Sequence, residues 1–317
     1  MKQMLSSAAR VLHHKGIGGF AKAAANRAVM AAYRDVLRAG YMKKRIHDYD
    51  MYLDLNDLGI SRTLLLFGSR EEDHRRILGR VLKPGMTVFD IGANIGYYVL
   101  MERGLIGPQG RILAIEPSPT NIRLLQRNIE ANGYTNITVR HMAASDRAGK
   151  GELLLSTMSN LNSFHASGSA SQYLSGKKVE VDVATVPQLA AMFGPPDLLR
   201  MDVEGHEVEI IRGMVDAVER REIGPMILFE THRGMYTPDH DIVEPLNRLF
   251  RAGYTVPYIA SSTARGASGI EALGYKHEGL FATDFEQRAI FKDISPEHLL
   301  HLLTGPGGVR TVLLGRR

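Results

Sequence analysis

Residues 87–98 of the chain read TVFDIGANIGYY, which predicts a strand, a glycine-rich turn and the start of a helix. The run 87–91 is short and mostly apolar, as is typical of a parallel strand covered on both faces. Gly92 and Gly96 allow a tight turn and a close approach of the backbone to a ligand. Ligands of open α/β sheets bind beyond the carboxyl ends of the strands, so this turn marks a candidate binding edge.

The second strand adds an acidic residue at the same edge. The apolar run 111–115 is followed by Glu116, twenty residues after Gly96. A carboxylate there can accept hydrogen bonds from both hydroxyls of a ribose, which predicts NAD or S-adenosylmethionine as the ligand. The NAD pattern requires a third glycine at position 97, which is Tyr97. Asp90 adds a carboxylate that suits a cationic ligand better than a diphosphate, so the pattern favours S-adenosylmethionine.

Strands and helices alternate along the rest of the chain. The expected strands are 87–91, 111–115, 137–143, 198–203, 226–229, 254–259 and 289–291. One helix is expected to start near residue 95, and four more to span 121–132, 187–193, 207–220 and 242–252. Runs 153–155 and 179–183 suggest a hairpin around a loop rich in Ser, Gly and Asn, and 261–270 is expected to be a mobile loop. The pattern predicts an α/β fold with a doubly wound, mostly parallel sheet.

The first 70 residues are expected to form an N-terminal extension, with the main domain at 71–317 and its first helix at 71–80. Residues 1–45 are interpreted as helix broken at Gly16, Gly18 and Gly19, and runs 52–55 and 63–67 as short strands. An apolar stripe is predicted along the helical part at Val11, Leu12, Ile17, Phe20, Ala24, Val29, Tyr33, Val36 and Leu37.

Positive charge is concentrated in residues 1–45, which we call the N-terminal arm. Residues 1–45 carry ten Lys and Arg against Asp35 alone, so the remaining 29 basic and 33 acidic residues give the body a net charge of −4. Two interpretations stay open: an interfacial helix on an anionic membrane, or a cap that packs on the domain or on a second subunit.

Composition excludes several classes of site and location. The chain has no cysteine, which removes disulfides, thiolate zinc sites and a cysteine nucleophile. No apolar run approaches the roughly 18 to 20 residues of a membrane-spanning helix, and the N-terminus lacks the apolar core of a secretory signal. We expect a cytoplasmic protein. Peripheral contact with a membrane through the arm stays an open possibility.

A second motif narrows the class. Residues 199–207 read LRMDVEGHE, which resembles the K-I/M-D-V-E-G-x-E signature of the FkbM family of methyltransferases, with Arg200 where Lys is usual. FDIGANIGYY (89–98), EPSP (116–119) and PMILFETH (225–232) match the pattern of that family in order. The resemblance covers about 85–235. It implies a Rossmann-like fold, S-adenosylmethionine as cofactor, and O-methylation of a hydroxyl on a sugar, a glycan or glycolipid, or a natural product.

The resemblance also implies the cofactor contacts, and 143–146 would cover the adenine. The residues matched to cofactor binding are Asp90, Gly92, Ala93, Asn94, Gly96, Glu116, Pro117, Ser118, Ala143 and Asp202.

Methylation of an alcohol requires a group that draws the proton from the acceptor. Candidate groups follow the fourth and fifth strands: Asp202, Glu204, His206, Glu230 and His232. In one reading Asp202, with Glu204 or Glu230, holds a divalent ion such as Mg²⁺ through oxygen ligands. In the other, His206 or His232 is a general base. Glu207 is interpreted only as a carboxylate at a helix N-terminus.

Two other functions compete with this prediction. A nicotinamide-dependent oxidoreductase is disfavoured by Tyr97, and a non-catalytic binding scaffold by the intact glycine turn and Glu116. A nucleic-acid acceptor is not expected, because the basic charge is confined to the arm. The predicted partner is a small-molecule, glycan or lipid-linked acceptor, and a homo-oligomer is left open.

Overall fold

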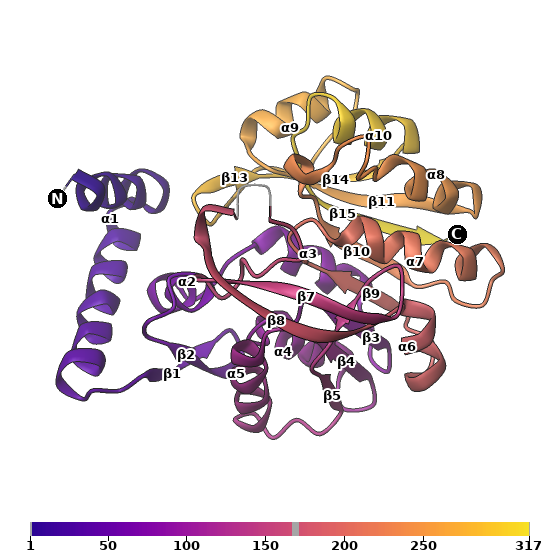
Figure 1. The fold of residues 1–317 in the computed structure, drawn as a ribbon. Helices are drawn as coiled ribbons and strands as arrows, with labels where there is room; N and C mark the ends of the chain where they lie inside the picture. Colours follow the sequence, from indigo (N-terminus) through magenta and orange to yellow (C-terminus); the bar gives the residue numbers. More distant parts are fainter. Residues whose placement is uncertain (1, 167–170, 317) are drawn as a thin grey trace.

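The computed structural model describes residues 2–166 and 171–316, and Figure 1 shows their arrangement. In this part of the chain eight strands form the central sheet in the order β14-β11-β15-β10-β9-β3-β4-β5. Their bounds are β3 Thr87–Ile91, β4 Arg111–Ile115, β5 Ile137–Arg140, β9 Leu198–Met201, β10 Met226–Glu230, β11 Tyr254–Ser261, β14 Ile290–Ile294 and β15 Val309–Arg316. The five strands from β5 to β10 are parallel, whereas β15 pairs antiparallel with both β10 and β11. The predicted α/β fold with a mostly parallel sheet is confirmed.

Helices cover both faces of this sheet. The helices on one face are α2 Ile60–Phe67, α3 Glu72–Val81, α4 Tyr97–Ile106 and α5 Pro119–Glu130. Those on the other are α6 Val186–Phe193, α7 Glu207–Glu219, α8 Val243–Arg251, α9 Ala264–Glu271 and α10 Pro296–Thr304. Alternate residues of a strand serve opposite faces, so Phe89 packs in one core and Val88 in the other.

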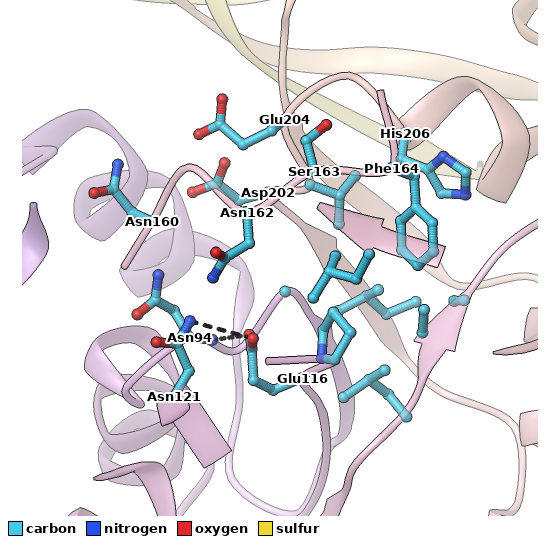
Figure 2. Close-up of a pocket in the computed structure, with 18 of the residues that line it drawn as sticks. Asn94, Glu116, Asn121, Asn160, Asn162, Ser163, Phe164, Asp202, Glu204 and His206 are labelled. Atoms are coloured by element: carbon cyan, nitrogen blue, oxygen red, sulfur yellow. Dashed lines mark hydrogen bonds between the residues drawn. The ribbon is translucent and has the colours of Figure 1, made fainter. Parts of the chain in front are cut away.

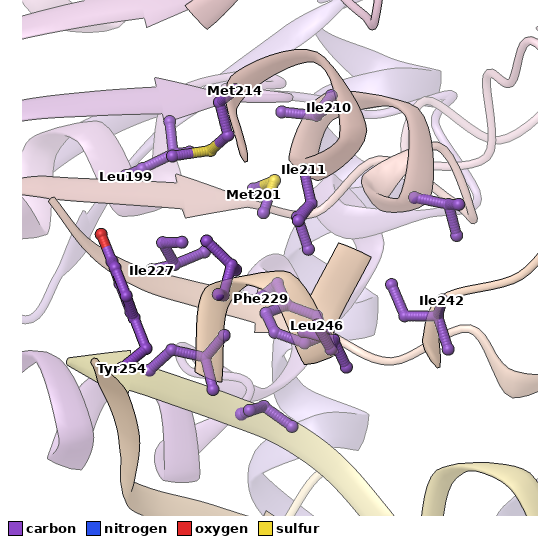
Figure 3. Packing of buried hydrophobic residues seen from close by; sticks show 14 of the residues in the cluster. Leu199, Met201, Ile210, Ile211, Met214, Ile227, Phe229, Ile242, Leu246 and Tyr254 are labelled. Atoms are coloured by element: carbon purple, nitrogen blue, oxygen red, sulfur yellow. The ribbon is translucent and has the colours of Figure 1, made fainter. Parts of the chain in front are cut away.

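Figure 3 shows the core beneath α7 and α8. Leu199 and Phe229 of the sheet pack with Met214 of α7 and Leu246 of α8, and each of these side chains is fully buried. Burying a side chain of this size contributes about 1.5–3 kcal/mol relative to leaving it in water. This packing fixes the strand ends, and therefore the residues that follow them.

A smaller sheet lies beside the main one. It consists of β6 Ala143–Ala144, β7 Gly149–Ser156 and β8 Leu174–Ala184, and the pairing of β7 with β8 confirms the predicted hairpin. The segment 157–166 leaves β7 and returns over the carboxyl ends of the main strands. We call residues 157–165 the covering segment.

The N-terminal region differs from the prediction in two places. α1 Lys2–Ala31 bends at Gly16, which has φ +65°, and a π-helical turn ends at Val36. The chain then forms a hairpin, β1 Tyr41–Ile46 with β2 Tyr49–Asp54, so the helix predicted through residue 45 stops earlier. The strand predicted at 63–67 is wrong, because Ile60 and Leu64 follow a helical period and are buried together in α2.

Two elements near the C-terminus also correct the prediction. The expected mobile loop at 261–270 contains helix α9, whose start is capped by the Thr263 hydroxyl accepting a hydrogen bond from the Gly266 amide. The last strand, β15, inserts between β10 and β11 and was not expected. A short hairpin, β12 Phe281–Thr283 with β13 Glu286–Arg288, precedes β14.

The division at residue 70 stays a prediction, although β2 and α2 share the core of the main sheet. Figure 1 shows α1 extending away from the body. No helix among the described residues is long and apolar enough to cross a membrane.

Candidate active site

The turn after β3 lies against the segment after β9. Gly92 has φ +81°, and a Cβ atom placed there would lie 2.2 Å from the carbonyl oxygen of Asp202. Only glycine therefore fits this position. The close approach brings the two strand ends together and leaves space beside them.

Glu116 is fixed at the wall of that space (Figure 2). Its Oε2 accepts a hydrogen bond from the Asn94 amide at 2.7 Å, and its Oε1 accepts from the Ser118 amide at 2.9 Å and from Asn121 Nδ2 at 3.2 Å. Burial raises the pKa of the carboxyl to about 7, against the effect of these donors. The side chain is rigid, and its charge changes near neutral pH.

A cavity of about 530 Å³ opens in front of Glu116. Its apolar walls are Ile91, Ile115, Ala143, Ala144, Leu153, Val203 and Phe164. We call it the cofactor cavity, after the ligand that the sequence predicts. The covering segment closes one side, because the carbonyl oxygen of Ser159 accepts hydrogen bonds from Nδ2 of Asn94 at 3.3 Å and of Asn121 at 2.9 Å. The cavity therefore combines apolar walls with a few converging polar groups, as small-molecule sites usually do.

A second, more polar cavity of about 840 Å³ adjoins the first. Both cavities are lined by Gly92, Asn94, Asn160, Asp202 and Glu204, which therefore stand at their junction. We call the second cavity the acceptor cavity, after the acceptor that the sequence predicts. It is further lined by Arg70, Glu71, Tyr97, Tyr98, Arg200, Glu230, His232 and Arg310.

Asp90 lies behind the cavities, paired with an arginine. Its side chain is fully buried and lines neither cavity, and its Oδ1 lies 2.8 Å from Arg200 Nη1. Arg200 Nη2 lies 3.2 Å from Asp202 Oδ2, and the guanidinium stacks 3.8 Å from the centre of the Tyr98 ring. Asp90 thus pairs with the arginine that positions Asp202, and a direct contact with a cationic ligand is not available to it.

Two carboxylates of the acceptor cavity, Glu204 and Glu230, have raised pKa values. Burial raises the pKa of Glu204 to about 7 and that of Glu230 to about 8. Arg310 bridges two acids, with Nη1 at 2.7 Å from Glu230 and Nη2 at 2.8 Å from Glu71. Glu204 also has a positive φ of 52°, an uncommon backbone state that is often found at functional sites.

His232 is held by a buried carboxylate. Its Nδ1 lies 3.1 Å from Glu207 Oε1, which also accepts hydrogen bonds from the His232 amide and from the Tyr236 hydroxyl. Its Nε2 lies 3.6 Å from Glu204 and 4.0 Å from Glu230. Burial opposes protonation, but Glu207 and the other acids raise the pKa of His232 well above its usual range. Glu207 therefore does more than favour a helix N-terminus, and that interpretation is wrong.

His206 faces a different part of the molecule. Its Nε2 lies 2.9 Å from Ser145 Oγ and its Nδ1 lies 3.2 Å from His165 Nε2. The ring lines the cofactor cavity and not the acceptor cavity, and burial lowers its pKa to about 4. The two candidate bases are thus separated, and only His232 opens onto the acceptor cavity.

The other predicted contacts have mixed positions. Those that line the cofactor cavity are Gly92, Asn94, Glu116, Pro117, Ala143 and Asp202. Ala93 lines the acceptor cavity, and Ser118 reaches the site only through its amide on Glu116. Gly96 begins α4 with φ +94° and lines neither cavity.

Sequence reasoning missed several lining residues. Those of the cofactor cavity are Asn121, Ser159, Asn160, Asn162, Ser163 and Phe164, and those of the acceptor cavity are Arg70, Glu71 and Arg310. The run TMSNLNSF at 157–164 is a local signal, because it places polar amides in a loop next to the predicted binding edge. The pairing of Glu71 with Arg310 has no local signal, because it joins residues 239 positions apart.

The glycine turn, the acidic end of β4 and the cavity across the carboxyl ends of parallel strands define a Rossmann-like methyltransferase fold. Within that class the chain belongs to the family of the methyltransferase FkbM domain, whose model matches residues 90–256. The model of protein-L-isoaspartate(D-aspartate) O-methyltransferase also matches, over residues 20–149.

Three relatives show the range of similarity. The hexuronic acid methyltransferase AglP of Haloferax volcanii is 25% identical over 172 residues, which cover 53% of this chain and 65% of that protein. The 31-O-demethyl-FK506 methyltransferase FkbM of Streptomyces tacrolimicus is 28% identical over 166 residues, 44% of this chain and 63% of that protein. A protein-L-isoaspartate O-methyltransferase of Methanococcoides burtonii is 37% identical over 60 residues, 19% and 30% of the two chains. The matches thus span less than two thirds of each relative.

Membership in this family makes S-adenosylmethionine the expected cofactor, and the cofactor cavity suits it. The buried Glu116 carboxylate can accept hydrogen bonds from ribose hydroxyls. Apolar walls that include Ala143 and Phe164 suit an adenine ring. At the junction, Asp202 and Glu204 supply negative charge for a sulfonium and an ammonium group.

Proposed function

We propose that the chain is an O-methyltransferase that methylates a hydroxyl of a sugar-like acceptor held in the acceptor cavity. One observation carries the proposal: this polar cavity meets the cofactor cavity at Asp202 and Glu204, with His232 in its wall. Charged and hydroxyl-bearing walls suit a polyhydroxylated molecule, and Arg70 and Arg310 add positive charge. The hexuronic acid named for one relative belongs to the same chemical class.

The cofactor, when bound, supplies an electrophilic methyl group. The chain has to orient the acceptor and remove its proton. We assign proton removal to His232 Nε2, which lines the acceptor cavity. Its Nδ1 contact with Glu207 fixes the orientation of the ring and stabilises the imidazolium that forms.

A divalent ion such as Mg²⁺ is the alternative activator. Atoms of Asp202, Glu204 and His232 lie within 4.8 Å of one another, as do those of Glu71, Asp202 and Glu230. Oxygen-rich sets of this kind suit hard cations. The guanidinium groups that pair with these acids already balance part of their charge, which favours the metal-free mechanism.

The reaction is tested by incubating the protein with S-adenosylmethionine and a panel of uronic acids, glycans, glycolipids and hydroxylated natural products. Mass spectrometry should find an acceptor heavier by one methylene unit, with the new methyl group on oxygen. Full activity after exhaustive chelation supports His232 as the base, and loss that Mg²⁺ restores supports the ion. Cofactor binding without transfer to any member of the panel would instead favour a binding scaffold.

A further inference from the structure

A cluster of three histidines and one glutamate lies beside the cofactor cavity and outside the proposed mechanism. His206 precedes α7, and Glu209 lies in the first turn of that helix. His165 belongs to the covering segment, and His240 to the loop between β10 and α8. The fold therefore brings together side chains from three separate parts of the chain.

The spacing of their polar atoms matches that of metal ligands. His206 Nδ1 lies 3.2 Å from His165 Nε2 and 3.4 Å from Glu209 Oε2, and His165 Nε2 lies 3.9 Å from Glu209 Oε1. Ligands about 2.0–2.1 Å from a tetrahedral ion are separated from each other by about 3.3–3.4 Å. One small ion placed between the three atoms would thus contact all of them after slight adjustment.

The hydrogen bonds around the cluster show how its members are held. His240 Nδ1 faces the carbonyl oxygen of Met235 at 2.7 Å, so this nitrogen must carry the hydrogen. Its Nε2 lies 3.0 Å from Glu209, and the protonated ring donates a hydrogen bond to that carboxylate. His206 Nδ1 and His165 Nε2 also face each other, and only one of them needs a hydrogen for their contact. The cluster therefore directs several lone pairs into one small space.

We propose that His165, His206 and Glu209 bind a zinc-type divalent ion, with His240 holding Glu209 in place. Two imidazole nitrogens and one carboxylate suit zinc, whereas Mg²⁺ prefers oxygen ligands throughout. The Ser145 hydroxyl bonds His206 Nε2 and keeps Nδ1 turned toward the site, as the outer partners of metal ligands do. The side chain of His165 is 22% exposed, which leaves room for a water ligand in the fourth position.

Such an ion would attach the covering segment to the main domain. Phe164 stacks on the His206 ring with their centres 4.9 Å apart, and both side chains line the cofactor cavity. Binding of the ion to His165 would therefore hold Phe164 at the cavity wall. The ion has a positioning role here and takes no part in methyl transfer.

The test uses the full chain, freed of metal by a chelator and without S-adenosylmethionine. Calorimetric titration with zinc should show one ion per chain, and His165→Ala and Glu209→Gln should each weaken binding at least about tenfold. His277→Ala is the matched control, because His277 Nε2 also lies near a glutamate, at 3.3 Å from Glu271, on a different part of the surface. Zinc affinity should be unchanged in that variant.

A second readout separates folding from binding. Zinc should raise the melting temperature of the wild-type chain but not that of His165→Ala, whose metal-free melting temperature shows whether it folds. Unchanged zinc affinity in His165→Ala and Glu209→Gln would overturn the proposal. Loss of binding in Glu204→Gln instead would place the ion in the acceptor cavity and would also overturn it. Neither result depends on methyltransferase activity.

Discussion

Glu116 combines two properties that rarely occur together, complete fixation and a pKa near neutrality. Three donors hold its carboxylate, yet burial raises its pKa to about 7. We expect Glu116→Ala to weaken S-adenosylmethionine binding by roughly 1.5–3 kcal/mol, the range for hydrogen bonds to a charged group. Calorimetry measures this, with NAD as the negative control. Binding of NAD without binding of S-adenosylmethionine would contradict the assignment.

The same pKa predicts how cofactor affinity depends on pH. Hydroxyl donors favour the ionised carboxylate, so below pH 7 the protein must release a proton to bind the ribose. Affinity should rise as pH increases from about 5.5 to 7 and level off above the pKa of Glu116. In Glu116→Gln this rise should disappear. An unchanged pH profile in that variant would show that another group controls binding.

The pair of His232 and Glu207 predicts a different effect, on turnover. Glu207 raises the pKa of His232, and a general base must be unprotonated to act, so activity should increase as pH rises through that raised pKa. His232→Ala should lower kcat by about 10²–10⁴-fold, the usual contribution of a general base, with a small change in cofactor affinity. Glu207→Gln should shift the pH profile of kcat to lower pH, because the stabilised imidazolium loses its charged partner.

Asp202 and Glu204 stand at the junction of the two cavities. We expect Asp202→Asn and Glu204→Gln to reduce turnover much more than cofactor affinity, because both side chains also face the acceptor. Rate measurements at saturating cofactor, combined with calorimetry, separate the two effects. Equal losses in affinity and turnover would show that these acids act only on the cofactor.

At the residue scale, the sequence predicted the groups that end strands better than their partners. Glu116 and Asp202 line the cofactor cavity because a strand end fixes where the next residue lies. The partner of Asp90 was not predicted, because Arg200 is 110 residues away and their contact is visible only in three dimensions. The role of Glu207 was underestimated for the same reason, since its contact with His232 joins the start of α7 to the segment after β10.

The covering segment is the element that completes the cofactor cavity. Asp57 holds this segment in place through hydrogen bonds. Asp57 Oδ1 accepts hydrogen bonds from the Ser159 amide at 3.1 Å and the Gly59 amide at 2.9 Å. Its Oδ2 accepts from the Ser159 hydroxyl at 2.8 Å and the Ser61 amide at 2.9 Å. One carboxylate thus connects the turn before α2 to the segment whose carbonyl reaches the Asn94 and Asn121 side chains.

We expect Asp57→Ala to loosen the covering segment and to weaken S-adenosylmethionine binding about tenfold, with the core intact. Loss of charge-assisted hydrogen bonds of about 1.5–3 kcal/mol each, which are not additive here, supports this direction. Hydrogen exchange should increase at the described residues 157–165. Asp54→Ala is a matched control, because among the described residues the Asp54 side chain accepts a hydrogen bond from the nearby Asn56 amide, at 2.8 Å, and forms none with the covering segment. Equal effects of Asp57→Ala and Asp54→Ala would contradict the role of Asp57 in holding the covering segment.

Elements with a strong local pattern were predicted best. Strands β3 and β4 match the expected ranges, because buried parallel strands are short apolar runs between turns. α2 and α9 are eight-residue helices, too short for the period to stand out from an apolar run or a small-residue loop. The place of β15 in the sheet depends on pairing with strands distant in sequence, so no local pattern predicts it.

At the scale of the whole molecule, the N-terminal arm extends away from the body, in which helices cover both faces of the sheet. The predicted stripe is exposed on the single chain: Leu12, Ile17, Phe20, Val29, Tyr33, Val36 and Leu37 are all exposed, with Ile17 at 80%. Val11 and Ala23 are buried, where α1 meets α2 and the body. Contact between the arm and its own domain therefore buries few side chains of the stripe. The two candidates to cover the others are a membrane surface and a second copy of the chain.

We propose the membrane surface, because the arm carries ten cations against one anion beside these exposed apolar residues. Each Lys or Arg near an anionic bilayer adds about 1 kcal/mol, and salt should weaken the binding steeply. The full chain should co-sediment with anionic vesicles at low salt and should not co-sediment with neutral vesicles. Deletion of residues 1–36, which removes six of the ten cations and spares β1, should weaken binding strongly.

The double substitution Ile17→Ser and Val36→Ser provides the sharper test, because both side chains are largely exposed, at 80% and 76%, and their loss should leave the fold intact. It keeps every charge of the arm and removes only apolar contact. An interfacial helix should then bind anionic vesicles more weakly, since insertion of apolar side chains adds to charge attraction. The membrane proposal fails if the full chain does not bind vesicles at low salt and sedimentation velocity shows that these substitutions dissociate a dimer. The stripe is then a subunit interface.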